Sequence, residues 1–279
     1  MPAPTIAVHD LGGTGPTVLY AHATGFHAHC WTAVTNHLPD LRHIAYDARG
    51  HGDTPVGADW VAGPVDWNEY GTDAADVAAD VAETVGNGGR LLGVGHSMGG
   101  ASLLKASLSA PQQFRGLIVY EPIAMPAEAA PPGEQDNPLV VGARKRRSCF
   151  ASFEDAIANY SNKPPMNVFT PGAMEAYVRY GFTENDDGQV HLKCTPEHEA
   201  QTYEAAGNHD TWERLGDVTV PVWVVSGAPR PLQPSARARE FASRIPGSRY
   251  IQLDHLGHFG PMEAPAEIAE IIAAASDAF

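Results

Sequence analysis

Short apolar segments alternate with longer segments of helical periodicity along most of the 279 residues. The short segments are rich in β-branched residues and bounded by turn-forming residues, which is typical of buried strands. Strands that alternate with helices form a mostly parallel sheet with helices on both faces. The pattern therefore predicts an α/β fold with strands at Thr5–Leu11, Thr17–Ala23, Arg42–Asp47, Leu91–Gly95, Gly116–Tyr120, Val220–Ser226 and Tyr250–Leu253, and helices at Asp73–Val85, Met98–Ala110 and Ala264–Ala275.

The alternation stops between Ile123 and Leu215. This segment is rich in proline and holds no apolar run comparable to the predicted strands, although Phe153–Tyr160 and Ala173–Tyr180 have helical periodicity. A stretch of about 90 residues is too long for a simple connection between two elements. We therefore predict a helical cap at residues 123–215, inserted between a first part of the core at 1–122 and a second part at 216–279.

A serine lies in a glycine-rich turn at the end of one predicted strand. The sequence Gly95-His96-Ser97-Met98-Gly99 fits the pattern G-x-S-x-G and is followed directly by a predicted helix. A sharp turn from strand to helix leaves no room for side chains at the two glycine positions, and it exposes the serine hydroxyl above the sheet. The helix N-terminus beneath the serine favours negative charge. Ser97 is therefore predicted to be a nucleophile.

A serine hydroxyl needs a base that removes its proton, and histidine is the usual base. His258 lies in a loop between the last predicted strand and the last predicted helix, where it can reach over the end of the sheet to Ser97. His255 is the alternative in this loop, but it directly follows the strand and is interpreted as structural. We predict that His258 is the base.

Attack by serine on an acyl group creates an oxyanion, which needs N–H donors. One donor is predicted to be the backbone N–H of Met98, the residue after the nucleophile. The other is predicted to be the backbone N–H of Thr24, in the loop after the strand Thr17–Ala23. His22 begins this loop and is interpreted as a residue that organises it.

Charge and composition narrow the classes of molecule that this protein is expected to bind. The formal net charge of −15 disfavours nucleic acid and anionic membranes, because phosphates are repelled. No run of 18 or more apolar residues and no signal-peptide pattern is present, so the expectation is a cytoplasmic protein without a membrane anchor. The basic run Arg144–Arg147 is interpreted as a solvated helix face, with a clamp for an acidic substrate as the alternative.

No cofactor or metal is expected. His27 and His29 lie close together, but no carboxylate or cysteine accompanies them at the spacing of metal ligands. The three cysteines are widely spaced, which predicts neither a disulfide framework nor a zinc site.

Four segments together resemble the α/β-hydrolase superfamily: HATGF at 22–26, DARGHGDT at 47–54, GHSMGG at 95–100 and GHFGPMEAP at 257–265. The resemblance covers the core on both sides of the insertion and implies an eight-stranded sheet with a cap after the sixth strand. The four segments are specific for the superfamily, but they give little indication of the substrate.

The acid of the catalytic triad departs from the common pattern. Most relatives carry an aspartate in the loop after the strand that corresponds to Val220–Ser226, but here Arg230 occupies that position. An arginine cannot accept a hydrogen bond from imidazole. Some relatives, including a subset of haloalkane dehalogenases, place the acid just after the sixth strand, and the corresponding residue here is Glu121. The resemblance therefore makes Glu121 the candidate acid. The alternative interpretation is that Glu121 is a surface residue that begins the cap.

These residues predict a serine hydrolase of esterase type that cleaves a small carboxylic ester or a related acyl bond. Dehalogenases attack with an aspartate, whereas position 97 is serine, so only the placement of the acid is shared with them. The alternatives are a carbon–carbon bond hydrolase, a lactonase or an acyltransferase that uses the same triad, and a non-catalytic binding protein. The expected partner is a small acyl substrate, and the sequence does not predict an oligomeric state.

Overall fold

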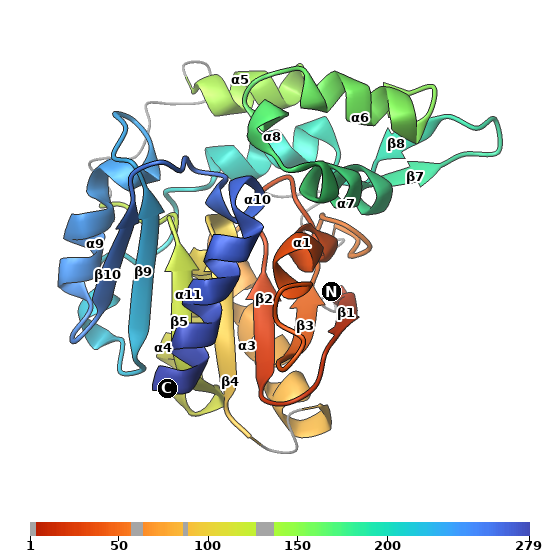
Figure 1. Ribbon diagram of the computed structural model, residues 1–279. Coiled ribbons are helices and arrows are strands. Elements are labelled where there is room, and N and C mark those ends of the chain that lie inside the picture. The colour runs from red at the N-terminus through yellow and green to blue at the C-terminus, as the bar shows by residue number, and fades with distance from the viewer. Residues whose placement is uncertain (1–3, 57–63, 86–88, 127–136) are drawn as a thin grey trace.

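A twisted sheet forms the centre of the molecule in the computed structural model, which describes residues 4–56, 64–85, 89–126 and 137–279 (Figure 1). Its strand order is β1-β3-β2-β4-β5-β9-β10. Only β1 runs antiparallel to its neighbour β3, and the other adjacent pairs are parallel. The strands are β1 (Val8–Gly12), β2 (Thr17–Ala21), β3 (Arg42–Tyr46), β4 (Leu91–His96), β5 (Phe114–Tyr120), β9 (Val222–Gly227) and β10 (Arg249–Leu253).

The mostly parallel α/β architecture confirms the predicted fold class, but the number of strands was wrong. Each of the seven apolar runs forms a strand, and the sheet in the described residues has seven strands rather than eight. The eighth strand was implied by the family resemblance alone. Only one apolar run precedes Thr17, so the described chain has a single strand, β1, on that side of β3.

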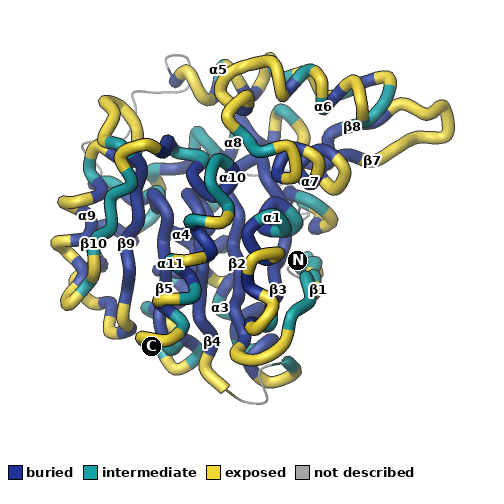
Figure 2. Tube along the Cα trace, in the orientation of Figure 1, coloured by how far each residue is buried: buried dark blue, intermediate teal, exposed yellow. Residues whose placement is uncertain are grey.

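Helices cover both faces of the sheet, and the strand side chains alternate between them. On β2, Leu19 and Ala21 belong to one buried hydrophobic cluster, whereas Val18 and Tyr20 belong to a second cluster on the opposite face. Figure 2 shows the resulting buried strands inside a partly exposed helical layer. The core helices are α1 (Thr32–Thr35), α3 (Trp67–Thr84), α4 (Met98–Ser109), α9 (Ala238–Arg244), α10 (Gly260–Glu263) and α11 (Pro265–Ala278), with single 3-10 turns at η1 (Ala28–Trp31), η2 (Pro111–Gln113), η5 (Leu215–Asp217) and η6 (Pro234–Arg237).

The segment between β5 and β9 forms a cap beside the end of the sheet (Figure 1). Besides helices, this segment contains a small antiparallel sheet of order β6-β8-β7, which the prediction of a helical cap did not include. Its strands have two or three residues each, too few to give a recognisable alternation. The cap elements are α5 (Pro138–Arg144), β6 (Cys149–Phe150), α6 (Phe153–Ser161), η4 (Met166–Val168), α7 (Pro171–Gly181), β7 (Phe182–Glu184), β8 (Val190–Leu192) and α8 (Pro196–Glu204).

Each of the four described α-helices between β5 and β9 begins at a polar N-capping residue that periodicity alone does not reveal. In each, a side-chain oxygen accepts a backbone N–H from the first turn, which satisfies a donor that the helix leaves free. Three of these helices also have proline in the first turn, where its missing N–H costs nothing. The capping residues are Asn137, Ser152, Thr170 and Thr195.

No helix among the described residues combines the length and the apolar character that crossing a bilayer requires. Among the described residues, the large hydrophobic side chains that are exposed are Val8, Leu139, Val168, Tyr180 and Leu232.

A buried carboxylate at the end of β3 ties the loops around the sheet together. Asp47 accepts backbone N–H groups from Ala28 at 2.7 Å and from Asp53 at 2.8 Å, and the His9 ring lies 2.8 Å away. Burial raises the pKa of Asp47, but the hydrogen bond from His9 and those from the backbone outweigh it and lower the pKa below its usual value. The carboxylate is therefore ionised at neutral pH.

We expect Asp47→Ala to lower the free energy of unfolding by about 3 kcal/mol, because it leaves the buried N–H of Ala28 without its acceptor. Urea unfolding followed by circular dichroism measures the change. Asp53→Ala is the matched control, since its exposed ion pair with Lys193 contributes less than about 1 kcal/mol. Equal effects of the two substitutions would contradict the role given to Asp47.

Candidate active site

Ser97 lies in a strained turn between β4 and α4. Its φ and ψ are 55° and −116°, a conformation that is costly for a residue with a side chain. The turn is held by a hydrogen bond from the Ser97 N–H to the carbonyl of Tyr120 at 2.9 Å. A Cβ on Gly99 would lie 2.3 Å from the carbonyl oxygen of Ala21, so this glycine cannot be replaced without moving the backbone. Glycine at position 99 therefore allows the serine turn to pack closely against the end of β2.

The loop after β10 brings an imidazole to this serine. His258 Nε2 lies 3.2 Å from Ser97 Oγ, across 161 positions of sequence. The His258 side chain is 23% exposed, and Ser97 is buried with 6% of its surface exposed. The two groups are within hydrogen-bonding distance, as a nucleophile and its base must be.

The other ring nitrogen of His258 bonds to Glu121. His258 Nδ1 lies 2.6 Å from Glu121 Oε2, and the side chain of Glu121 is fully buried. Its second oxygen, Oε1, accepts the backbone N–H of Gly227 at 2.9 Å. Glu121 directly follows β5 and also has a positive φ, of 43°. The alternative of an exposed residue at the start of the cap does not describe its position.

Arg230 lies outside this chain of hydrogen bonds. It is exposed, and its backbone N–H donates to Ser235 Oγ at 3.2 Å. The end of β9 nevertheless contributes to the site, because Gly227 donates to the carboxylate of Glu121. Thus the end of β9 donates a hydrogen bond to a carboxylate that follows the neighbouring strand β5.

His255, the alternative to His258, faces away from Ser97. It is exposed, and its Nε2 lies 2.7 Å from Glu267 Oε2 on α11. The structure therefore brings only one of the two histidines of this loop to the serine.

Residues that the sequence analysis missed hold the His258 loop in place. His96 Nε2 lies 2.8 Å from the carbonyl oxygen of His258, and the hydroxyl of Tyr120 donates to the carbonyl of Gly257 at 2.6 Å. Glu263 accepts the N–H of Gly257 at 3.1 Å. A signal was available for His96, which stands inside the G-x-S-x-G motif, but none marked Tyr120 or Glu263.

The loop after β2 packs against the serine turn. The carbonyl of His22 accepts the N–H of Gly99 at 3.0 Å, and the hydroxyl of Thr24 contacts Met98 Sδ at 3.5 Å. Across the described part of the chain, the backbone N–H groups of Thr24 and Met98 donate to no protein acceptor. His22 organises the loop, since its Nε2 accepts the N–H of Ala48 and its Nδ1 bonds to the carbonyl of Ala23.

Four aromatic rings cluster between the core and the cap near these residues. Phe26 and Phe259 follow the Thr24 and His258 loops, and Phe169 and Tyr177 come from the cap. Phe26 lies 5.2 to 6.0 Å from each of the other three, measured between ring centroids. Sequence reasoning identified neither Phe26 nor Phe259, because a single aromatic residue in a loop has no periodicity to interpret.

Five histidines around the site are buried and kept neutral by their surroundings. Burial lowers the pKa of His27 to about 3 and holds the pKa of His51 and His96 well below the usual value. Burial also lowers the pKa of His22 and His198. Each therefore keeps a neutral ring that can donate at one nitrogen and accept at the other.

One group of side chains in the described residues has the composition of a metal site. His9, Asp47 and Asp53 offer ligand atoms within 4.8 Å of one another. However, Asp47 already accepts two backbone N–H groups, and Asp53 forms an ion pair with Lys193. The group is explained by these internal bonds.

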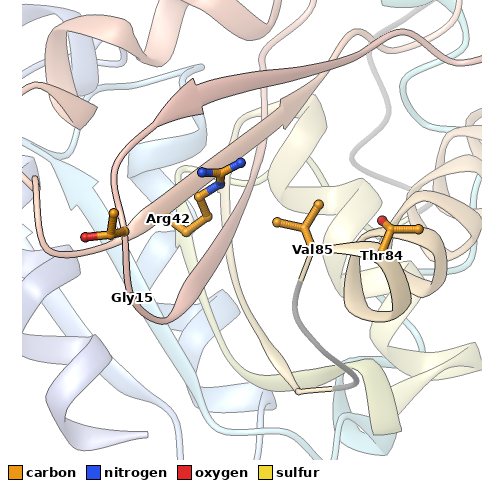
Figure 3. A pocket seen from close by; sticks show the side chains of 5 residues that line it. Gly15, Arg42, Thr84 and Val85 are labelled. Carbon is orange, nitrogen blue, oxygen red and sulfur yellow. The ribbon is translucent and has the colours of Figure 1, made fainter.

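A hollow lies at the end of the sheet opposite Ser97 (Figure 3). Thr14, Gly15 and Arg42 line it near the amino ends of β2 and β3, together with Thr84 and Val85 at the end of α3. Ser97 follows the carboxyl end of β4, so this hollow is separate from the serine.

The sequence is similar to that of a known protein family and of several known proteins. Residues 18–271 match the sequence pattern of a family described as "Alpha/beta hydrolase family". The chain is 32% identical over 117 residues to "Lipase LipV" of Mycobacterium tuberculosis, an alignment that covers 41% of this chain and 41% of the lipase. It is 26% identical over 218 residues to "Abhydrolase domain-containing protein AFT2-1" of Alternaria alternata, which covers 66% of this chain and 81% of that protein.

The fold is also similar to that of solved structures. Superposition on "E-2-(Acetamidomethylene)succinate Hydrolase" gives a TM-score of 0.79 with 21% sequence identity, and covers 98% of this chain and 96% of that one. At this identity the likeness concerns the fold alone.

The buried histidines predict a strong loss of stability in mild acid. In each the folded-state pKa is lowered, so its contribution is complete above the unfolded pKa of about 6.5 and is lost as the pH falls below that value. Each histidine adds up to about 1.4 kcal/mol per pH unit to this slope. His9 acts in the opposite sense, because its hydrogen bond with Asp47 raises its pKa.

Urea unfolding between pH 7.5 and 5.5 measures this slope. His51→Gln is expected to reduce it by about the share of one histidine, because it removes one group that takes up a proton on unfolding. A free energy of unfolding that stays constant over this range would contradict the prediction.

Proposed function

Because the chain belongs to the alpha/beta hydrolase family, we propose that it is a serine hydrolase that cleaves a small carboxylic ester or a related acyl bond. The observation that carries the proposal is the continuous path of hydrogen-bonding distances from Ser97 through His258 to Glu121. A nucleophile, a base and an orienting acid in this order are the parts that acyl transfer to serine needs.

In the first step, Ser97 Oγ attacks the acyl carbon of the substrate and His258 Nε2 takes its proton. The carboxylate of Glu121 accepts the hydrogen bond from His258 Nδ1 and thereby fixes the tautomer that leaves Nε2 free. The same carboxylate stabilises the imidazolium while the tetrahedral intermediate exists. The bond from Gly227 keeps the carboxylate in this orientation.

The oxyanion of the tetrahedral intermediate is bound by the N–H groups of Met98 and Thr24. Two features support this role: both groups lack a protein acceptor in the described residues, and the two residues touch each other beside Ser97. Donors fixed by the backbone need no rearrangement when the charge develops, which makes them effective in the transition state. We refer to residues 22–27 below as the oxyanion loop.

The leaving group departs with the proton from His258, which leaves the acyl group on Ser97 as an ester. Water then attacks this ester while His258 accepts one of its protons, and a second tetrahedral intermediate uses the same two donors. Collapse of this intermediate returns the proton to Ser97 Oγ and releases the carboxylic acid. The balanced reaction is an ester and water giving an acid and an alcohol.

The surroundings of the site suit an apolar acyl or alcohol group. Phe26, Phe169 and Phe259 lie next to the catalytic loops, and such rings bury apolar groups well. The relative that carries the name lipase points to the same class of bond, although the alignment covers only part of both chains. A short-chain p-nitrophenyl ester is therefore the first substrate to use.

Ser97→Ala is expected to abolish the hydrolysis of p-nitrophenyl butyrate and to leave the fold intact. The reason is that no other group forms the acyl-enzyme. A fluorophosphonate probe should modify Ser97 in the wild-type protein and no residue in the variant, as checked by mass spectrometry of the tryptic peptides. Turnover that persists in a clean Ser97→Ala preparation would refute the assignment.

Glu121→Gln is expected to lower kcat by about 10⁴, because the amide cannot stabilise the imidazolium and favours the wrong tautomer. Arg230→Ala, at the position of the acid in most relatives, serves as the matched control and should keep kcat within a few-fold of the wild type. Steady-state kinetics at constant folded fraction measure both. If Arg230→Ala were the more damaging change, the acid would have been assigned wrongly.

A further inference from the structure

The cap places a charged pair against the oxyanion loop. Arg146, in the turn after α5, and Glu199, on α8, are joined by an ion pair of 2.7 Å, with 14% and 9% of their side chains exposed. Sequence analysis interpreted the basic run that contains Arg146 as solvated, and for this residue that interpretation was wrong. The acidic residues of α8, which lie 53 positions away in sequence, draw the run against that helix.

The pair packs directly on a glycine of the loop. Gly25, which follows Thr24, has φ of +76°, and a Cβ there would lie 2.5 Å from Glu199 Oε1 and 3.3 Å from Arg146 Nη1. The charged groups of the cap therefore touch the backbone beside the predicted oxyanion donor. Any displacement of the loop toward the cap is blocked by this contact.

Tyr177 of α7 joins the pair to the loop. Arg146 Nη2 donates to the hydroxyl of Tyr177, and that hydroxyl in turn donates to the carbonyl of Gly25 in a long hydrogen bond of 3.5 Å. The backbone carbonyl of Tyr177 lies 2.9 Å from His27 Nε2, at the other end of the loop. Burial keeps His27 neutral by lowering its pKa to about 3, so its single ring proton must be on Nε2 to donate to this carbonyl. Tyr177 thus bonds to Gly25 and His27, the residues before and after Phe26 in the sequence.

All three guanidinium nitrogens of Arg146 already have protein partners. Nη1 bonds to Glu199, Nη2 to Tyr177 and Nε to Tyr160, the last at 3.2 Å. These bonds use three of the five N–H donors of the guanidinium, and Glu199 already neutralises its charge. The contacts therefore favour a role in holding the loop over a role in binding an anion.

We propose that Tyr177, oriented by the Arg146–Glu199 pair, is a positioning residue that holds the oxyanion loop so that the Thr24 N–H points at the substrate oxygen. This inference rests on the proposed function, because it assigns to the cap a part in the same hydrolysis. Its consequence is that the cap does more than enclose the substrate: when it docks on the core, it completes the oxyanion hole.

The test compares two variants of this linkage with a control. Tyr177→Phe removes the hydroxyl and keeps the ring that packs on Phe26. The double variant Arg146→Met, Glu199→Met removes the charged pair without leaving either charge unpaired. Arg144→Met is the control, because it breaks the nearby ion pairs of Arg144 with Glu197 and Glu204 on α8, and neither pair contacts the oxyanion loop.

Two readouts separate positioning from packing. The first is the division of the effect between kcat and KM for p-nitrophenyl butyrate. The second is the inhibition constant of an alkyl trifluoromethyl ketone, whose adduct with serine puts an oxyanion in the hole. A misplaced donor weakens the binding of both the transition state and its analogue, so kcat falls and the inhibition constant rises. Loss of a pocket wall instead weakens substrate binding and raises KM.

We expect Tyr177→Phe to lower kcat about tenfold, less than the effect of removing an oxyanion donor outright, and to raise the ketone inhibition constant by a similar factor. KM should stay within about twofold. The double variant should show the same pattern, and Arg144→Met should match the wild type. If Tyr177→Phe does not fold, the double variant decides.

Normal kcat and ketone inhibition in both variants would overturn the inference, as would a rise in KM at constant kcat. These results are distinct from a failure of the proposed function. A wild-type protein without Ser97-dependent turnover contradicts both proposals, whereas normal wild-type turnover that survives in both variants contradicts only this one.

Discussion

The structure depends on one buried carboxylate, that of Glu121, and on how its charge is compensated. A carboxylate with no exposed surface needs donors at both oxygens, and Gly227 and His258 provide them. Because His258 is one of the two, the need to compensate the charge also fixes the imidazole over Ser97. Stability and site geometry therefore have the same cause. The backbone strain at Ser97 and Glu121, at the ends of adjacent strands, is maintained by this network and by the hydrogen bond between Ser97 and Tyr120.

Much of the fold could be predicted from the sequence because buried parallel strands give continuous apolar runs. Leu91–His96 and Val222–Gly227 are examples, since every residue in both strands is buried. The cap was harder to predict. Its strands have only two or three residues, and its helices are short, so their boundaries depend on caps such as Thr170 and Thr195 more than on periodicity. The expected eighth strand came from resemblance and had no apolar run of its own.

The residues of the site also differ in how far the sequence alone predicts them. Ser97 and His258 could be proposed because each stands in a motif that a strand precedes and a helix follows. Glu121 could be proposed only after Arg230 was seen to be unsuitable, and its bond to Gly227 had no sequence signal at all. Contacts between core and cap, such as that of Tyr177 with Gly25, join residues 152 positions apart. Such pairs depend on how the cap docks, which no local pattern specifies. The same contacts link the cap to the oxyanion loop, so the two parts of the molecule are coupled through packing.

The most direct measurement of the central claim is proton NMR of the His258 ring in protein labelled with ¹⁵N-histidine. If the short contact between His258 Nδ1 and Glu121 Oε2 is a charge-assisted hydrogen bond, its proton resonates far downfield of ordinary imidazole N–H signals and is bonded to ¹⁵N. The account predicts that this resonance is present in the wild type and absent from the Glu121→Gln and His258→Ala variants. A downfield region that is empty in the wild type, or a resonance that survives in Glu121→Gln, would contradict it.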